Sequence, residues 1–174
     1  IHLVPFAEYD LVPTFFSPLK DLNLNINRGV FKKGEEYVNF NLNNLNFSDL
    51  ICYESSFPRY ARKFVKNGAD FLLIQANDGW LGKSAGPYQH FAQAKLRAIE
   101  NRIPIVRGGN TGISGVILPT GEVTKKTKLG EKIIIKEKLP LYDPGTFYTF
   151  YGDIFAVIAF LTFLFLGPVN CLRN

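Results

Sequence analysis

Apolar and polar side chains alternate along residues 37–42. This period of two places the apolar residues on one face, as in a half-buried strand. Asn43 and Asn44 follow, and asparagine tolerates the left-handed backbone of a tight turn. Because residues 45–51 are again largely apolar, the pattern predicts a β-hairpin.

Two later segments have the period of a helix that buries one face. Pro58 suits the first turn of one helix, and Gly68 suits its end. The second helix is predicted over residues 87–102, because apolar residues recur at helical spacing and Pro104 cannot continue it. Its inward face is formed by Phe91, Ala94, Ala98 and Ile99.

Short apolar runs around these helices predict further strands. They lie at residues 70–75, 104–107, 113–118 and 132–139, with a tight turn at residues 119–122. Since strands alternate with helices, we expect an α/β fold in which helices pack on a sheet.

The C-terminal stretch is apolar on every side. Residues 154–169 contain no charged residue, although a bilayer span needs about 20 residues. A buried core helix or strand is one interpretation. The missing polar face, the aromatic residues just before the stretch and Arg173 after it favour a transmembrane helix. We therefore divide the chain into a domain over residues 1–146 and a membrane segment over residues 147–174.

Composition excludes several classes of protein. With 174 residues, 47% hydrophobic and 20% charged, the chain suits one globular domain and no disordered or coiled-coil class. Two cysteines exclude a disulfide-stapled mini-protein and a four-cysteine zinc module. The net charge of +5 is spread along the chain, so it predicts no nucleic-acid partner and leaves a membrane surface open. Without any methionine, the sequence is expected to be a fragment with no signal peptide at its start.

Candidate chemistry gathers where strands are predicted to end. Cys52 lies between an apolar strand and a helix, where a turn can aim backbone N–H groups at a thiolate. The alternative is a small buried hydrophobe. Glu54 adds a carboxylate to the same turn, or it caps the helix that follows. Glu8 follows another apolar strand and could serve catalysis or a surface salt bridge.

Other polar residues have weaker spacing. His2 and His90 are the only histidines, and neither suggests a metal site or a Cys–His pair. We expect His90 to be a packed, hydrogen-bonded helix residue. The segment at residues 77–80 is either the lip of a pocket that carries Trp80 or simply a turn.

Five motifs occur in a fixed order along the chain. They are Leu3-Val4-Pro5-Phe6-Ala7-Glu8, Ile51-Cys52-Tyr53-Glu54, Asn77-Asp78-Gly79-Trp80-Leu81-Gly82, Gly86-Pro87-Tyr88-Gln89-His90-Phe91 and Arg97-Ala98-Ile99-Glu100. Two further segments, residues 109–114 and 119–122, continue the series. Together they resemble the apolipoprotein N-acyltransferases, the membrane-bound branch of the nitrilase (carbon–nitrogen hydrolase) superfamily, over roughly residues 1–123.

The resemblance implies an αββα sandwich with a Glu–Lys–Cys triad. Cys52 matches the nucleophile, and Glu8 matches a further active-site glutamate, although Ala7 replaces the usual glycine. Tyr53 and Glu54 match residues that the family needs after the nucleophile. Trp80 matches an aromatic residue on a mobile loop near the substrate entrance. The triad lysine and general-base glutamate would lie upstream of this sequence, so we expect the fragment alone to be inactive.

The implied activity is an acyl transfer without a cofactor or metal. A phospholipid would donate an acyl chain through a cysteine thioester to the N-terminal diacylglyceryl-cysteine of an apolipoprotein. The implied location is the bacterial inner membrane, with the catalytic domain facing the periplasm. Two alternatives stay open: a soluble nitrilase-type amidase acting on a small amide, and a non-catalytic, membrane-tethered binding domain.

Overall fold

A computed structural model describes residues 34–171, with side chains described up to residue 165. Its strands are β1 (Phe40–Leu42), β2 (Leu45–Ile51), β3 (Phe71–Asn77), β4 (Ile105–Asn110), β5 (Gly115–Ile117) and β6 (Val123–Lys126). Its α-helices are α1 (Pro58–Lys66), α2 (Gly86–Asn101), α3 (Phe147–Tyr151) and α4 (Ile154–Cys171). Two short 3₁₀ helices, η2 (Cys52–Ser56) and η3 (Asp78–Leu81), directly follow β2 and β3.

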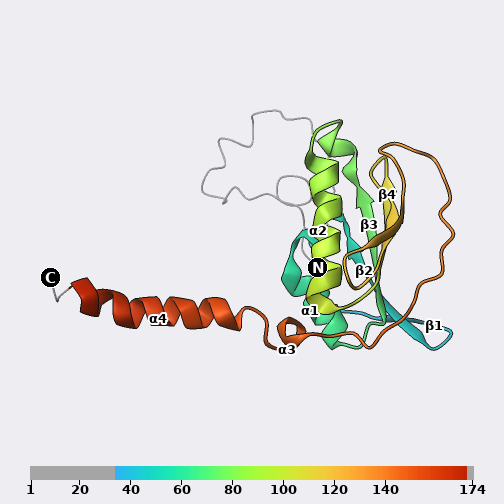
Figure 1. The fold of residues 1–174 in the computed structure, drawn as a ribbon. Coiled ribbons are helices and arrows are strands. Elements are labelled where there is room, and N and C mark those ends of the chain that lie inside the picture. The colour runs from blue at the N-terminus through green and yellow to red at the C-terminus, as the bar shows by residue number, and fades with distance from the viewer. Residues whose placement is uncertain (1–33, 172–174) are drawn as a thin grey trace, which may run out of the picture.

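The six strands form one mixed sheet in chain order. Strands β2, β3 and β4 are parallel, while β1, β5 and β6 pair antiparallel at the two sides. The predicted hairpin is confirmed: β1 pairs with β2, and Asn43 and Asn44 have φ angles of 50° and 67°. Parallel strands need crossover connections, and α1 and α2 provide them on one face of the sheet (Figure 1).

The core lies between that face and the two helices. Leu50, Leu72 and Ile74 are fully buried there against helix residues such as Ala61 and Ala98. Both predicted helices are confirmed, each within about one residue of its expected start. α1 has Pro58 in its first turn, and Arg102 ends α2 in the left-handed conformation.

Ile99 departs from the predicted inward face of α2. Its side chain is 49% exposed. It lies instead over the turn at Gly121, where an added Cβ would approach Ile99 Cδ1 to 2.5 Å. A glycine with a φ of +82° is therefore required at this turn for two independent reasons, backbone conformation and space.

The opposite face of the sheet is open in the described residues. Phe40, Phe47 and Phe71 stack across three neighbouring strands, with ring centroids 5.4 and 5.2 Å apart. Phe40 is nevertheless 50% exposed, so the prediction of a half-buried first strand is wrong for this part of the chain. Only one helix-covered sheet, or half of the expected αββα sandwich, lies within residues 34–171.

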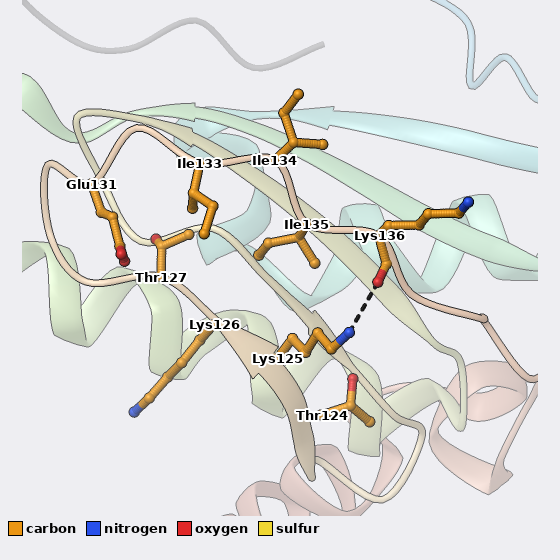
Figure 2. Close-up of a pocket in the computed structure, with 9 residues that line it drawn as sticks. All are labelled: Thr124, Lys125, Lys126, Thr127, Glu131, Ile133, Ile134, Ile135 and Lys136. Carbon is orange, nitrogen blue, oxygen red and sulfur yellow. Dashed lines mark hydrogen bonds between the residues drawn. The ribbon is translucent and has the colours of Figure 1, made fainter.

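The strand predicted at residues 132–139 is wrong, because this segment has no regular secondary structure. It passes beside β6 and borders a hollow of about 480 Å³ (Figure 2). Lys125 attaches it through a side chain rather than a ladder: its Nζ donates to the carbonyl of Lys136 and pairs with Glu137, both at 3.0 Å. A run of three isoleucines cannot place all of them on one buried face, and Ile134 is 92% exposed.

The C-terminal segment leaves the domain through α3. Thr149 Oγ1 donates to Asn101 at the end of α2, and Arg62 of α1 donates to the carbonyl of Thr149. α4 then extends away from the sheet (Figure 1), and all of its described side chains are exposed. The interpretation as a buried core helix is therefore wrong. Among the described residues, no helix combines the length and hydropathy of a membrane span, so the predicted transmembrane helix is not confirmed.

Candidate active site

Cys52 occupies a strained turn at the end of a central strand. It is the first residue of η2, directly after β2, and its φ angle is +47°. A left-handed conformation costs a non-glycine residue about 1–3 kcal/mol and persists only where surrounding contacts enforce it. The thiol is free and partly exposed, and its Sγ lies 4.0 Å from the carbonyl oxygen of Asn77 at the end of β3. The interpretation of Cys52 as a buried hydrophobe is therefore wrong.

A cavity of about 1010 Å³ opens at this edge of the sheet. Its lining includes Cys52 and Trp80 of η3, and Trp80 has 75% of its surface exposed. Three of the residues at 77–80 (Asn77, Asp78 and Trp80) border this cavity, which agrees with the pocket-lip interpretation. The apolar side chains in the lining include Ile51, Tyr53, Ala76, Trp80 and Leu81, and the polar ones include Ser56, Gln75, Asn77, Gln89, His90 and Gln93.

Glu54 closes the turn that carries the thiol. Its Oε2 accepts a hydrogen bond from the backbone N–H of Ile51 at 2.9 Å, and the residue is 95% buried, with 5% of its surface exposed. This bond caps η2, which contains Glu54 itself, and not α1, which begins at Pro58. Tyr53 is partly exposed, and its ring meets Phe57 edge-on at 5.0 Å.

Two of the predicted residues cannot be compared with this site. Glu8 and His2 lie outside the described residues. The proximity of Glu8 to Cys52 therefore stays a prediction.

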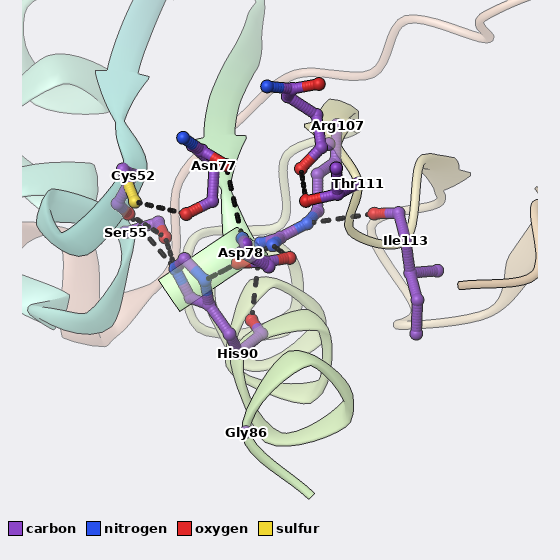
Figure 3. Close-up of polar contacts among 12 residues, drawn as sticks. Cys52, Ser55, Asn77, Asp78, Gly86, His90, Arg107, Thr111 and Ile113 are labelled. Atoms are coloured by element: carbon purple, nitrogen blue, oxygen red, sulfur yellow. Dashed lines mark hydrogen bonds and ion pairs between the residues drawn. The ribbon is translucent and has the colours of Figure 1, made fainter. Parts of the chain in front are cut away.

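His90 is packed and hydrogen-bonded, as the sequence predicts. Its Nε2 lies 3.0 Å from Ser55 Oγ and 3.1 Å from the carbonyl oxygen of Cys52 (Figure 3). Its Nδ1 lies 2.7 Å from Asp78 Oδ1. The imidazole therefore contacts the backbone of Cys52 and makes no Cys–His pair with its sulfur.

Sequence reasoning missed the ion pair behind His90. Arg107 Nη2 donates to Asp78 Oδ2 at 2.7 Å, and both residues are almost fully buried. Arg107 also donates to the carbonyl of Ile113. One signal was available: a charged residue in the apolar strand at residues 104–107 needs a buried partner, and buried charges are rarely unpaired.

The environment of Asp78 favours its ionised form. Burial raises the pKa of this carboxyl, but the hydrogen bond from His90 and the charges of Arg107 and His90 outweigh it, so the pKa lies below its usual value. Packing is tight here as well. A Cβ on Gly112 would meet Asp78 Oδ2 at 2.1 Å, so only glycine fits beside the carboxylate.

The arrangement suits nucleophilic chemistry. A partly exposed thiol on a strained turn, in the lining of a partly apolar cavity, can attack a carbonyl carbon and hold the acyl group as a thioester. Within residues 34–171, no three His, Cys, Asp or Glu side chains gather as a metal site would require.

Comparison with known proteins agrees with this geometry. Residues 7–142 match the family model described as carbon-nitrogen hydrolase. The chain is 35% identical over 156 residues to an apolipoprotein N-acyltransferase of Geobacter metallireducens, covering 90% of this chain and 30% of that protein. It is 39% identical over 166 residues to the apolipoprotein N-acyltransferase of Rickettsia bellii, covering 95% and 32%. The chain thus spans about a third of the length of these curated relatives.

Solved structures share the fold at low identity. A Saccharomyces cerevisiae protein from branch 10 of the nitrilase superfamily matches with a TM-score of 0.51 and 22% identity, over 59% of this chain and 41% of that one. A carbon–nitrogen hydrolase from Helicobacter pylori G27 matches with a TM-score of 0.53 and 18% identity, over 59% and 44%. Given the family match over residues 7–142, the chain belongs to the carbon–nitrogen hydrolase family, and the apolipoprotein N-acyltransferases are among its relatives.

Proposed function

We propose that this chain supplies the nucleophile of an apolipoprotein N-acyltransferase. The observation that carries the proposal is Cys52 itself, which stands on a strained turn and lines a partly apolar cavity with an exposed tryptophan at the rim. The names of the curated relatives support the same reading.

In the first step, Cys52 attacks the carbonyl carbon of the sn-1 ester of a phospholipid. The C–S bond forms, the ester C–O bond breaks, and the lysophospholipid leaves with the proton that the thiol gave up. A thiolate suits this step because it is both a good nucleophile and a good leaving group.

In the second step, the α-amine of a diacylglyceryl-cysteine attacks the thioester carbonyl. The C–N bond forms, the C–S bond breaks, and the amine proton returns to Cys52. The product is an amide on the apolipoprotein, and the enzyme regains its starting form without a cofactor.

The remaining candidate residues take roles around these steps. Glu8 takes the role of the further active-site glutamate that the family resemblance implies. Glu54 holds the turn at Cys52 through its bond to Ile51. Tyr53 and Trp80 line the cavity and contact the lipid or the acceptor.

Membrane attachment completes the proposal. The side chains of α4 that are exposed include aromatic and aliphatic residues such as Phe155 and Phe163. Their transfer from water into lipid is favourable, because it removes apolar surface from water. We place the domain of residues 1–146 on the periplasmic side of a bacterial inner membrane, with residues 147–174 as its interfacial and membrane segment. A reporter fused after Asn174 tests this: it should be active only as a cytoplasmic type, and a periplasmic reporter signal would contradict the orientation.

The catalytic proposal is tested in a full-length acyltransferase that contains this sequence. After incubation with phospholipid, mass spectrometry should find a hydroxylamine-sensitive acyl group on the peptide with Cys52, and none in Cys52→Ala. The substitution Cys171→Ala serves as the matched control and should leave acylation unchanged. An acyl-enzyme that still forms in Cys52→Ala would refute the proposal. Hydrolysis of small amides without acyl transfer would favour the amidase alternative.

A further inference from the structure

His90 lies directly behind the nucleophile, on a different element. It belongs to the first half of α2, and its Nε2 reaches the carbonyl oxygen of Cys52, 38 positions earlier in the chain. Ser55 Oγ donates to the same carbonyl at 2.7 Å and contacts the same ring nitrogen. When both ring nitrogens carry hydrogen, Nδ1 donates to Asp78 and Nε2 donates to the carbonyl of Cys52, which is then held by both His90 and Ser55.

The ring of His90 is itself held in one orientation. Asp78 accepts from its Nδ1, Arg107 holds the other oxygen of Asp78, and Arg107 also lies 3.4 Å from the carbonyl of His90 (Figure 3). His90 is 8% exposed, Asp78 2% and Arg107 2%. Since buried hydrogen bonds to charged groups are strong and directional, Nε2 has little freedom to turn away from Cys52.

We propose that His90 is a positioning residue for the nucleophile, acting through the carbonyl of Cys52. The inference rests on the proposed function of Cys52 and names a further residue for the same site. His90 also lines the cavity, but the proposal rests on its contact with the carbonyl of Cys52 and not on a contact with substrate.

The contact matters because of the strain at Cys52. A residue with a φ angle of +47° relaxes unless its peptide groups are fixed. Because the peptide unit is planar, a fixed Cys52 carbonyl also fixes the direction of the Tyr53 N–H and limits the orientation of the thiol. Loss of the Nε2 contact therefore lets the sulfur leave its productive orientation without opening the core.

Two substitutions separate this role from a general structural one. His90→Gln keeps a donor near the position of Nε2, whereas His90→Asn keeps a donor near Nδ1 and loses the reach to Cys52. If His90 acts through the Cys52 carbonyl, Gln should preserve function better than Asn. If it only satisfies Asp78, Asn should be the better replacement.

The experiment measures the alkylation rate of Cys52 by iodoacetamide in the full-length protein, followed on the Cys52 peptide by mass spectrometry. We expect His90→Asn to slow alkylation and kcat by about tenfold, the scale of one lost hydrogen bond, with KM almost unchanged. His90→Gln should stay within about threefold of wild type, because its donor is retained.

Asn101→Ala is the matched control, since Asn101 is a fully buried polar residue at the other end of α2. It should lower the melting temperature and leave the alkylation rate unchanged. Wild-type alkylation in His90→Asn, or Asn outperforming Gln, would overturn the inference. Because alkylation needs no substrate, this result is independent of whether the acyl transfer itself is correct.

Discussion

The two faces of the sheet differ in what covers them. On one face α1 and α2 bury Leu72 and Ile74 completely, and the ion pair of Asp78 and Arg107 lies at the edge of this buried layer. On the other face Leu73 is only half-buried within the described residues. Cys52 and its cavity lie at the C-terminal ends of the parallel strands. The covered face therefore supplies the rigid support, and the open face supplies access.

Breaking the ion pair should have the largest effect on stability. Arg107→Met leaves the Asp78 carboxylate buried without its cationic partner, which costs about 3–5 kcal/mol of unfolding free energy. Chemical denaturation of the full-length protein measures it. Arg59→Met is the control, because Arg59 lies over the ring of Tyr60 at the surface, and it should cost less than about 1 kcal/mol. An equal loss of unfolding free energy in the two variants would contradict a stabilising role of the buried ion pair.

A pair of neighbouring leucines sharpens the comparison of the faces. Leu72→Ala should cost about 2–5 kcal/mol, because it leaves a void under the helices. The αββα sandwich implied by the resemblance would also cover Leu73 in a full-length protein, so we expect Leu73→Ala to cost a similar amount there. A cost below about 1 kcal/mol for Leu73→Ala would mean that the second face stays open.

Acid should lower the unfolding free energy by protonating Asp78. Its pKa is lower in the folded protein than the ordinary value of 3.8, so the unfolded state binds this proton first. The resulting stability is present above pH 3.8 and is lost as the pH falls through the folded pKa. Denaturation series at several acidic pH values should show a smaller loss in Asp78→Asn than in wild type. The surface substitution Asp143→Asn is the control and should keep the wild-type slope; a wild-type slope in Asp78→Asn would contradict this prediction.

The rim of the cavity should have the smallest effect on stability. Trp80→Ala removes an exposed ring, so the unfolding free energy should change by less than about 0.5 kcal/mol. Acyl transfer should nevertheless fall by about tenfold if the ring contacts substrate. Tyr88→Ala removes another exposed aromatic ring, one that does not line the cavity, and should change neither quantity. Unchanged transfer in Trp80→Ala would remove this residue from the site.

Short sequence patterns were sufficient to predict the strands and helices that carry the site. The asparagine pair at residues 43–44 and the proline at the start of α1 depend on backbone preferences of single residues, and the structure confirms both. The strand end at Cys52 was also predictable. The contacts around Cys52 were not predictable, because one of them comes from His90 on α2, 38 positions away.

Other features depend on contacts between residues far apart in the chain, and a single sequence does not show which residues meet. The segment at residues 132–139 is apolar enough for a strand, yet the described part of the sheet offers it only a lysine side chain. The ion pair joins Asp78, which directly follows β3, to Arg107 within β4, 29 positions further along the chain. Only the order of the parallel strands places them together.

That strand order also constrains when the contacts around Cys52 form during protein synthesis. β3 must pair with β4 before Arg107 can reach Asp78, and α2 must dock before His90 reaches Cys52. These non-local contacts close late relative to local turns, since long loops must first be ordered. We expect a nascent chain that has emerged only as far as β3 to carry Cys52 in a relaxed backbone. We expect Cys52 to adopt its left-handed backbone conformation only once residues through Arg107 have left the ribosome and folded.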